Sequence, residues 1–127
     1  MNVLIIEDNP SHLKLARLVL NAAGHAVNDA GAGDEALAAI EKEKPQVILL
    51  DLSLPGIDGL SLVRNLKSNP ATADIPVVAV TAHPEMWSRK AALEAGCSVY
   101  LVKPINTRTL PSEVVGACGA KPPAEQT

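Results

Sequence analysis

The chain has 127 residues, a length that suits one domain, and its 11 basic against 14 acidic residues give a net charge of −3. This acidic balance argues against nucleic acid or an anionic membrane as the main partner. Hydrophobic residues make up 47% of the chain but aromatic residues only 2%, so Leu, Ile, Val and Ala have to build the core.

No segment predicts export or membrane insertion. The first apolar run, residues 3–6, stops after four residues and has no basic segment before it, unlike a signal peptide. No stretch approaches the roughly 20 apolar residues of a membrane-spanning helix. Cys97 and Cys118 lack metal-ligand spacing. We therefore expect a cytoplasmic protein with free thiols.

Short apolar runs alternate with helical patterns along the chain. The segments expected to form strands are 3–6, 26–30, 46–50, 76–80 and 99–102, and those expected to form helices are 10–23, 33–42, 59–68, 84–95 and 107–118. Asn9 suits the N-cap of the first helix and Pro10 its first position. Pro111 removes a backbone hydrogen bond, so the last helix either starts late, near Thr109, or bends there.

Five strands alternating with five helices predict βαβ units around a parallel sheet. Four of the strands are continuous apolar runs, as expected for strands that are covered on both faces. We expect residues 1–118 to form one domain without a second one, and residues 119–127 to form a disordered tail.

Polar residues follow four of the predicted strands at their carboxyl ends. They are Glu7 and Asp8 after the first strand, Asp51 after the third, Thr81 after the fourth and Lys103 after the fifth, and Ala82 and Pro104 come next after the last two. Ligands of open parallel sheets bind beyond those ends. If the four strands are neighbours, three acids, a hydroxyl and an ammonium group converge on one cleft.

Three carboxylates that lie close together repel one another, and a hard divalent cation relieves that repulsion. Mg²⁺ prefers oxygen ligands and typically takes one or two carboxylates together with a phosphate. Asp8 and Asp51 suit direct ligation, the backbone carbonyl of Ser53 offers a third oxygen, and Glu7 suits a metal-bound water. The pattern therefore favours a magnesium site.

An ionised Asp51 in this cleft is a plausible nucleophile that attacks phosphorus and forms an acyl phosphate. Lys103 supplies a compact positive charge for one phosphoryl oxygen, and Thr81 a hydrogen bond to another. The small side chain of Ala82 leaves room for the incoming group.

With these residues the chain resembles the receiver domain of two-component response regulators over residues 1–118. The resemblance is carried by Glu7-Asp8, Asp51, the run 54–59, Thr81-Ala82, Ala95-Gly96 and Lys103-Pro104. It implies a flavodoxin-like, three-layer (βα)₅ fold with a five-stranded parallel sheet in the order 2-1-3-4-5. Within that family the chain most resembles stand-alone receivers, which have Thr-Ala-His after the fourth strand and Lys-Pro-Ile after the fifth, as in residues 81–83 and 103–105 here.

The resemblance also implies a function. Asp51 would accept a phosphoryl group from a sensor histidine kinase or a histidine phosphotransfer protein, with Mg²⁺ as cofactor. The domain would assist its own phosphorylation and dephosphorylation without being an enzyme. Its output would be a downstream protein that binds a face made by residues 84–118, or the chain would serve as an intermediate in a phosphorelay or as a phosphate sink.

Further residue roles come from the same resemblance. Tyr100, three residues before the lysine, looks like the rotamer switch that works with Thr81. Ser53 and His83 match positions that influence the lifetime of the acyl phosphate. The bond before Pro104 is expected to be cis, a form that is accessible mainly before proline.

Three other functions stay open at this point. A phosphatase with an aspartate nucleophile would have a second acid two residues after Asp51, where this chain has Ser53. A nucleotide- or flavin-binding module would need a glycine-rich motif that is missing. A degenerate receiver would have lost the metal-binding acids, the phosphoacceptor, the threonine or the lysine, and all of them are present here.

Other polar residues suit structural roles. Asp58 fits a helix cap, and His12 and His25 fit helix or loop surfaces.

Overall fold

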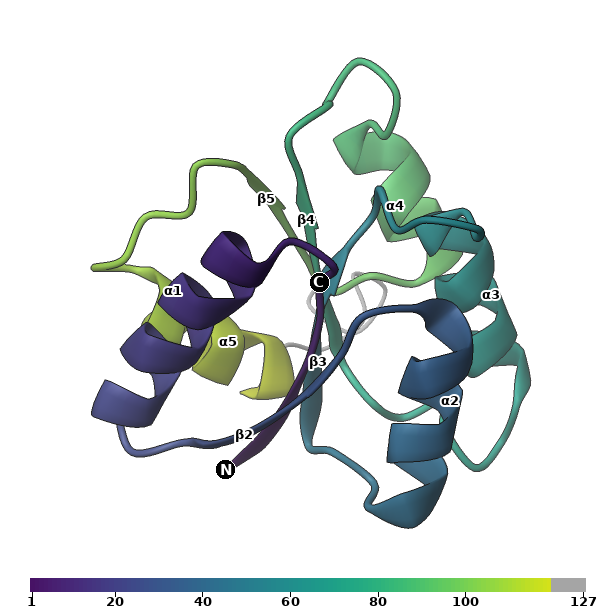
Figure 1. Cartoon of the computed structure of the whole chain (residues 1–127). Coiled ribbons are helices and arrows are strands. Elements are labelled where there is room, and N and C mark those ends of the chain that lie inside the picture. The colour runs from purple at the N-terminus through teal and green to yellow at the C-terminus, as the bar shows by residue number, and fades with distance from the viewer. Residues whose placement is uncertain (120–127) are drawn as a thin grey trace.

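Five strands form a parallel sheet in the order β2-β1-β3-β4-β5 in the computed structural model, which describes residues 1–119 (Figure 1). The strands are β1 (Asn2–Ile6), β2 (Ala26–Ala30), β3 (Val47–Asp51), β4 (Val77–Thr81) and β5 (Val99–Val102). The helices are α1 (Pro10–Ala22), α2 (Gly33–Lys42), α3 (Gly59–Ser68), α4 (Arg89–Ala95) and α5 (Leu110–Gly119). The predicted fold class and strand order are confirmed. The predicted tail lies outside the described residues except for Gly119, the last residue of α5.

Helices cover both faces of the sheet, α2, α3 and α4 on one and α1 and α5 on the other (Figure 1). Successive side chains of a strand point to opposite faces. In β1, Leu4 and Ile6 therefore pack with the first group of helices, and Val3 and Ile5 with the second. This double burial explains the unbroken apolar runs of β1, β3 and β4.

The start of α4 corrects the prediction of a helix over residues 84–95. Pro84 permits a helix start, but the Ser88 hydroxyl accepts a hydrogen bond from the Ala91 N–H at 3.1 Å and caps the helix there. Residues 83–88 form a turn in which the Trp87 N–H donates to the His83 carbonyl at 3.1 Å. Trp87 consequently lies in the loop before α4 and not in its first turn.

The starts of α1 and α5 follow the sequence signals. Asn9 caps α1, and its side-chain oxygen accepts from the N–H groups of Ser11 at 2.9 Å and His12 at 3.1 Å. Helix α5 begins at Leu110, so Pro111 falls in its first turn and the late start is the correct alternative. Among residues 1–119, no helix combines the length and apolar character needed to cross a membrane.

Candidate functional site

The sheet order makes β1, β3, β4 and β5 neighbours, so the polar residues that follow them meet at one edge. In the strand register Ile6 lies beside Leu50, and Asp51 beside Val80. Glu7 and Asp51 are each only 6% exposed, while Asp8 is exposed. Since Asp51 is the last residue of β3, the sheet itself fixes its backbone.

Three acids form a compact cluster at this edge. Glu7, Asp8 and Asp51 each offer a carboxylate oxygen, and these oxygens all lie within 4.8 Å of one another. Burial, together with the neighbouring Asp51, raises the pKa of Glu7 to about 7. Burial also disfavours ionisation of Asp51, but hydrogen bonds from Glu7, the Ser53 N–H and Lys103 outweigh it and hold its pKa below the usual value. The contacts of Asp51 therefore favour its charged form, whereas burial disfavours the charged form of Glu7.

Lys103 reaches this cluster from the loop after β5. Its Nζ lies 2.6 Å from Glu7 Oε1 and 3.1 Å from Asp51 Oδ2, and its side chain is 10% exposed. The third contact of Nζ is Nδ1 of His12, at 2.8 Å. The ammonium group thus lies beside the Asp51 carboxylate, where it can also face a group bound to that carboxylate.

Ser53 occupies the other oxygen of Asp51. Its N–H and its hydroxyl both donate to Asp51 Oδ1, at 3.0 Å and 2.9 Å. These bonds orient the carboxylate and favour its charged form. The ligand role expected for the Ser53 carbonyl oxygen stays a prediction.

Thr81 ends β4 and is fully buried. Its Oγ1 accepts a hydrogen bond from the His83 N–H at 2.9 Å, and the hydroxyl keeps a proton to donate. Ala82 and His83 are exposed, and His83 Nδ1 lies 3.3 Å from Glu85 Oε1. Pro104 is exposed, and the peptide bond before it is cis, as the resemblance led us to expect.

Tyr100 points into the core and is 6% exposed. Its hydroxyl donates to the backbone carbonyl of Trp87, and the Trp87 indole N–H donates to Asp58 Oδ1 at 2.9 Å. Asp58 is the N-cap of α3, as expected. Two hydrogen bonds, both through Trp87, therefore connect the loop that follows Asp51 to β5. No motif in the sequence predicts this connection.

His12 is the site residue that sequence reasoning missed. It was expected on a helix surface, and its side chain is indeed 46% exposed, yet its ring contacts Lys103. The only local signal is its position in the first turn of α1, close behind Glu7 and Asp8.

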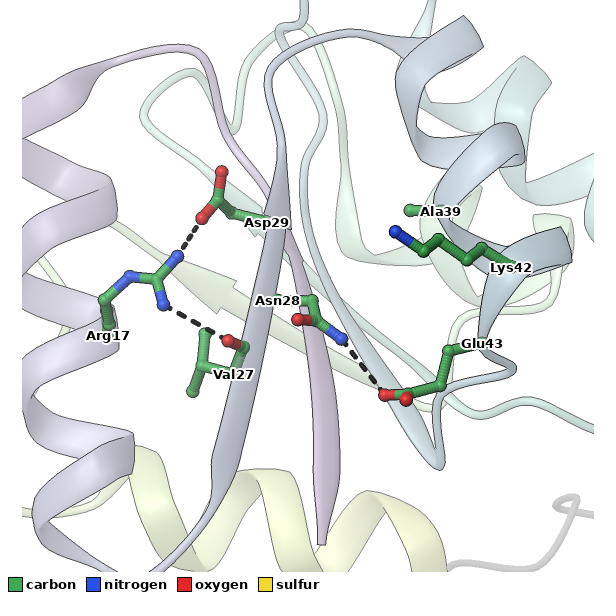
Figure 2. A pocket seen from close by; sticks show the side chains of 7 residues that line it. All are labelled: Arg17, Val27, Asn28, Asp29, Ala39, Lys42 and Glu43. Carbon is green, nitrogen blue, oxygen red and sulfur yellow. Dashed lines mark hydrogen bonds and ion pairs between the residues drawn. The ribbon is translucent and has the colours of Figure 1, made fainter.

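A pocket at the free edge of β2 lies apart from this cluster. Figure 2 shows its lining residues, which are Arg17, Val27, Asn28, Asp29, Ala39, Lys42 and Glu43. Arg17 pairs with Asp29 and donates to the Val27 carbonyl, and Asn28 donates to Glu43 at 3.2 Å. These groups satisfy one another, and none of them belongs to the predicted site.

An acidic cluster, a lysine and a buried threonine at one edge of this parallel sheet define the receiver class of phosphoacceptor domains. The sequence profile of the response regulator receiver domain matches residues 3–115, so the chain belongs to that family. Receivers are signalling domains of two-component systems, and phosphorylation by a kinase is their general role.

Individual relatives agree in length and in structure. The polar-differentiation response regulator DivK of Brucella ovis is 35% identical over 105 residues, which are 83% of this chain and 85% of that protein. The chemotaxis response regulator CheY4 of Vibrio cholerae superposes with a TM-score of 0.82 at 28% identity, covering 91% of this chain and 97% of that one.

A third relative carries a metal ion. The receiver domain of the sensor histidine kinase PA1611 from Pseudomonas aeruginosa superposes with a TM-score of 0.84 at 28% identity, covering 94% of this chain and 98% of that one. That structure holds a magnesium ion coordinated in its active-site cleft.

Proposed function

We propose that Asp51 accepts a phosphoryl group from a sensor histidine kinase or a histidine phosphotransfer protein. The observation that carries this proposal is the setting of Asp51, a nearly buried carboxylate with Lys103 at one oxygen and Ser53 at the other. One carboxylate oxygen bonds to phosphorus while the bond from phosphorus to the donor histidine breaks, and the electron pair of that bond returns to the donor imidazole.

The acids fit a magnesium ion, because three carboxylate oxygens within 4.8 Å of one another form the hard oxygen donor set that Mg²⁺ prefers. Asp8 and Asp51 would bind the ion directly, with the Ser53 carbonyl as a further ligand and Glu7 holding a bound water. When bound, Mg²⁺ neutralises charge on the phosphoryl oxygens.

The remaining residues act on the phosphoryl group. Lys103 pairs with one phosphoryl oxygen, the Thr81 hydroxyl donates to another, and Ala82 leaves space for the group. Ser53, His83 and the Pro104 turn border the cleft and modulate how long the acyl phosphate lasts. The domain assists its own phosphorylation and dephosphorylation, but it is the modified molecule and not an enzyme that turns over a substrate.

Intact-mass spectrometry with acetyl phosphate and Mg²⁺ tests the acceptor. We expect one phosphoryl adduct in the wild type, none after EDTA, and none in Asp51→Asn. The matched control is Asp58→Asn, since asparagine also caps helices and the change removes a nearby acid outside the cluster. An adduct that persists in Asp51→Asn would place the acceptor elsewhere, and steady hydrolysis of a generic phosphate ester would favour a phosphatase.

Output runs through the face of residues 84–118, which binds a downstream protein in the cytoplasm. In the phosphorylated state Thr81 moves toward the phosphoryl group, and Tyr100 takes the inward orientation. Tyr100 has that same orientation in this structure. A phosphoryl group shifts this equilibrium only through its different affinity for the two states. Hydrogen exchange with beryllofluoride, a phosphoryl mimic, should alter protection across residues 84–104; changes confined to the Asp51 loop would contradict this readout.

A further inference from the structure

The ammonium group of Lys103 has a full set of hydrogen-bond partners. It carries three N–H donors and meets three acceptors, Glu7 Oε1 at 2.6 Å, His12 Nδ1 at 2.8 Å and Asp51 Oδ2 at 3.1 Å. A lysine stem loses much rotamer freedom when its end is fixed, so each acceptor contributes to holding it over the cleft.

Helix α1 positions the acceptor that His12 supplies. His12 lies in the first turn, where its backbone N–H donates to the Asn9 cap at 3.1 Å. An ammonium group can donate only to a ring nitrogen that has no proton, so this contact requires the tautomer in which Nε2 carries the hydrogen and Nδ1 accepts. Nδ1 is 3.8 Å from Glu7 Oε1, and the closer partner is therefore Lys103.

The three acceptors have different roles in the proposed function. Glu7 and Asp51 belong to the acidic cluster that would hold the cation, and Asp51 changes chemically when it is phosphorylated. His12 lies outside that cluster. We propose that His12 is a positioning residue for Lys103, which keeps the ammonium group over the cleft when the acids turn to the cation and the phosphoryl group. This inference rests on the proposed function of the site.

Two substitutions separate the acceptor atom from the shape of the side chain. In His12→Asn the Oδ1 atom is attached to Cγ, as Nδ1 is in histidine, and it can accept the same hydrogen bond. In His12→Leu a methyl group takes that place and accepts nothing. Ser11→Ala, in the same exposed turn of α1, serves as the control for effects on the helix.

The first readout is the Lys103 ammonium resonance in ¹H–¹⁵N spectra of the lysine side chains, assigned by its loss in Lys103→Arg. We expect a slowly exchanging signal, with and without Mg²⁺, in the wild type, His12→Asn and Ser11→Ala, and its loss by exchange with water in His12→Leu. The same signal in His12→Leu as in the wild type overturns the proposal, as does its loss in both His12 variants.

The second readout is the rate of phosphorylation by acetyl phosphate, a small donor that brings no partner protein to the surface of α1. His12→Leu should slow it about fivefold, the effect of one lost hydrogen bond, and His12→Asn should restore it to within about twofold. Equal rates in His12→Leu and the wild type overturn the positioning role. A wild type that takes no phosphoryl group would refute the proposed function, whereas the ammonium spectra would still report on the contact.

Discussion

Replacing Gly59 by alanine should destabilise the protein, because Gly59, the first residue of α3, packs directly against the backbone of Leu52. A Cβ at residue 59 would lie 2.6 Å from the Cα and 2.7 Å from the carbonyl oxygen of Leu52. Both atoms are backbone, so neither can swing aside. The Gly59 N–H also donates to that carbonyl at 3.1 Å, and the shift that relieves the clash would lengthen this bond.

The expected loss can be built from its parts. Overfilling a packed region costs about 1–3 kcal/mol, and a weakened backbone hydrogen bond adds about 1 kcal/mol. The higher helix propensity of alanine returns up to about 1 kcal/mol. We therefore expect the free energy of unfolding to fall by about 2 kcal/mol, which for a domain of this size lowers the Tm by about 8 °C.

Urea and thermal unfolding followed by circular dichroism measure this change. The matched control is Gly116→Ala, which makes the same chemical change inside α5, where a Cβ would meet no heavy atom within 4 Å. That variant should gain about 0.5–1 kcal/mol. A Gly59→Ala protein that is as stable as the wild type would refute the tight contact between the start of α3 and Leu52.

Three further results are expected. Burial raises the pKa of the Cys97 thiol to about 12, so at about pH 8 its thiolate fraction is about a thousandfold below that of an ordinary thiol. Iodoacetamide should therefore label the exposed Cys118 first in native protein. Labelling of Cys97 in native protein at the rate seen in urea would contradict this. Asn9→Ala removes the cap of α1 and should lower the unfolding free energy by about 1 kcal/mol in urea melts, and no change would discount the cap. Lys67→Met keeps the apolar stem but loses two hydrogen bonds to the backbone carbonyls of Ala73 and Ile75. Chemical denaturation should show that the free energy of unfolding falls by about 1–3 kcal/mol, and an unchanged value would argue against those bonds.

The predicted and observed structures differ mainly where several local signals compete. Strands 26–30 and 99–102 and helices 33–42 and 59–68 have the predicted bounds, since their ends carry strong breakers or caps. The start of α4 was placed too early because Pro84 and Ser88 both signal a helix start. The cap hydrogen bond from the Ala91 N–H to Ser88 marks the observed start.

The candidate site shows the same division. Glu7, Asp51, Thr81 and Lys103 could be found from sequence because each directly follows or ends an apolar strand, and parallel strands bring such ends together. The contact of His12 with Lys103 could not, since it joins residues 91 positions apart through the direction of two side chains.

By itself, the sequence determined the alternation of strands and helices, the burial of the sheet on both faces and the edge at which the polar residues meet. These properties follow from local patterns of apolar residues, caps and breakers, and from the geometry common to all parallel sheets. The tertiary structure decided in which direction the pKa values of Glu7 and Asp51 shift, which three acceptors hold Lys103 and how Trp87 connects Asp58 to Tyr100. Those features depend on desolvation and on distances between residues far apart in the chain, and both arise only when the helices pack against the sheet.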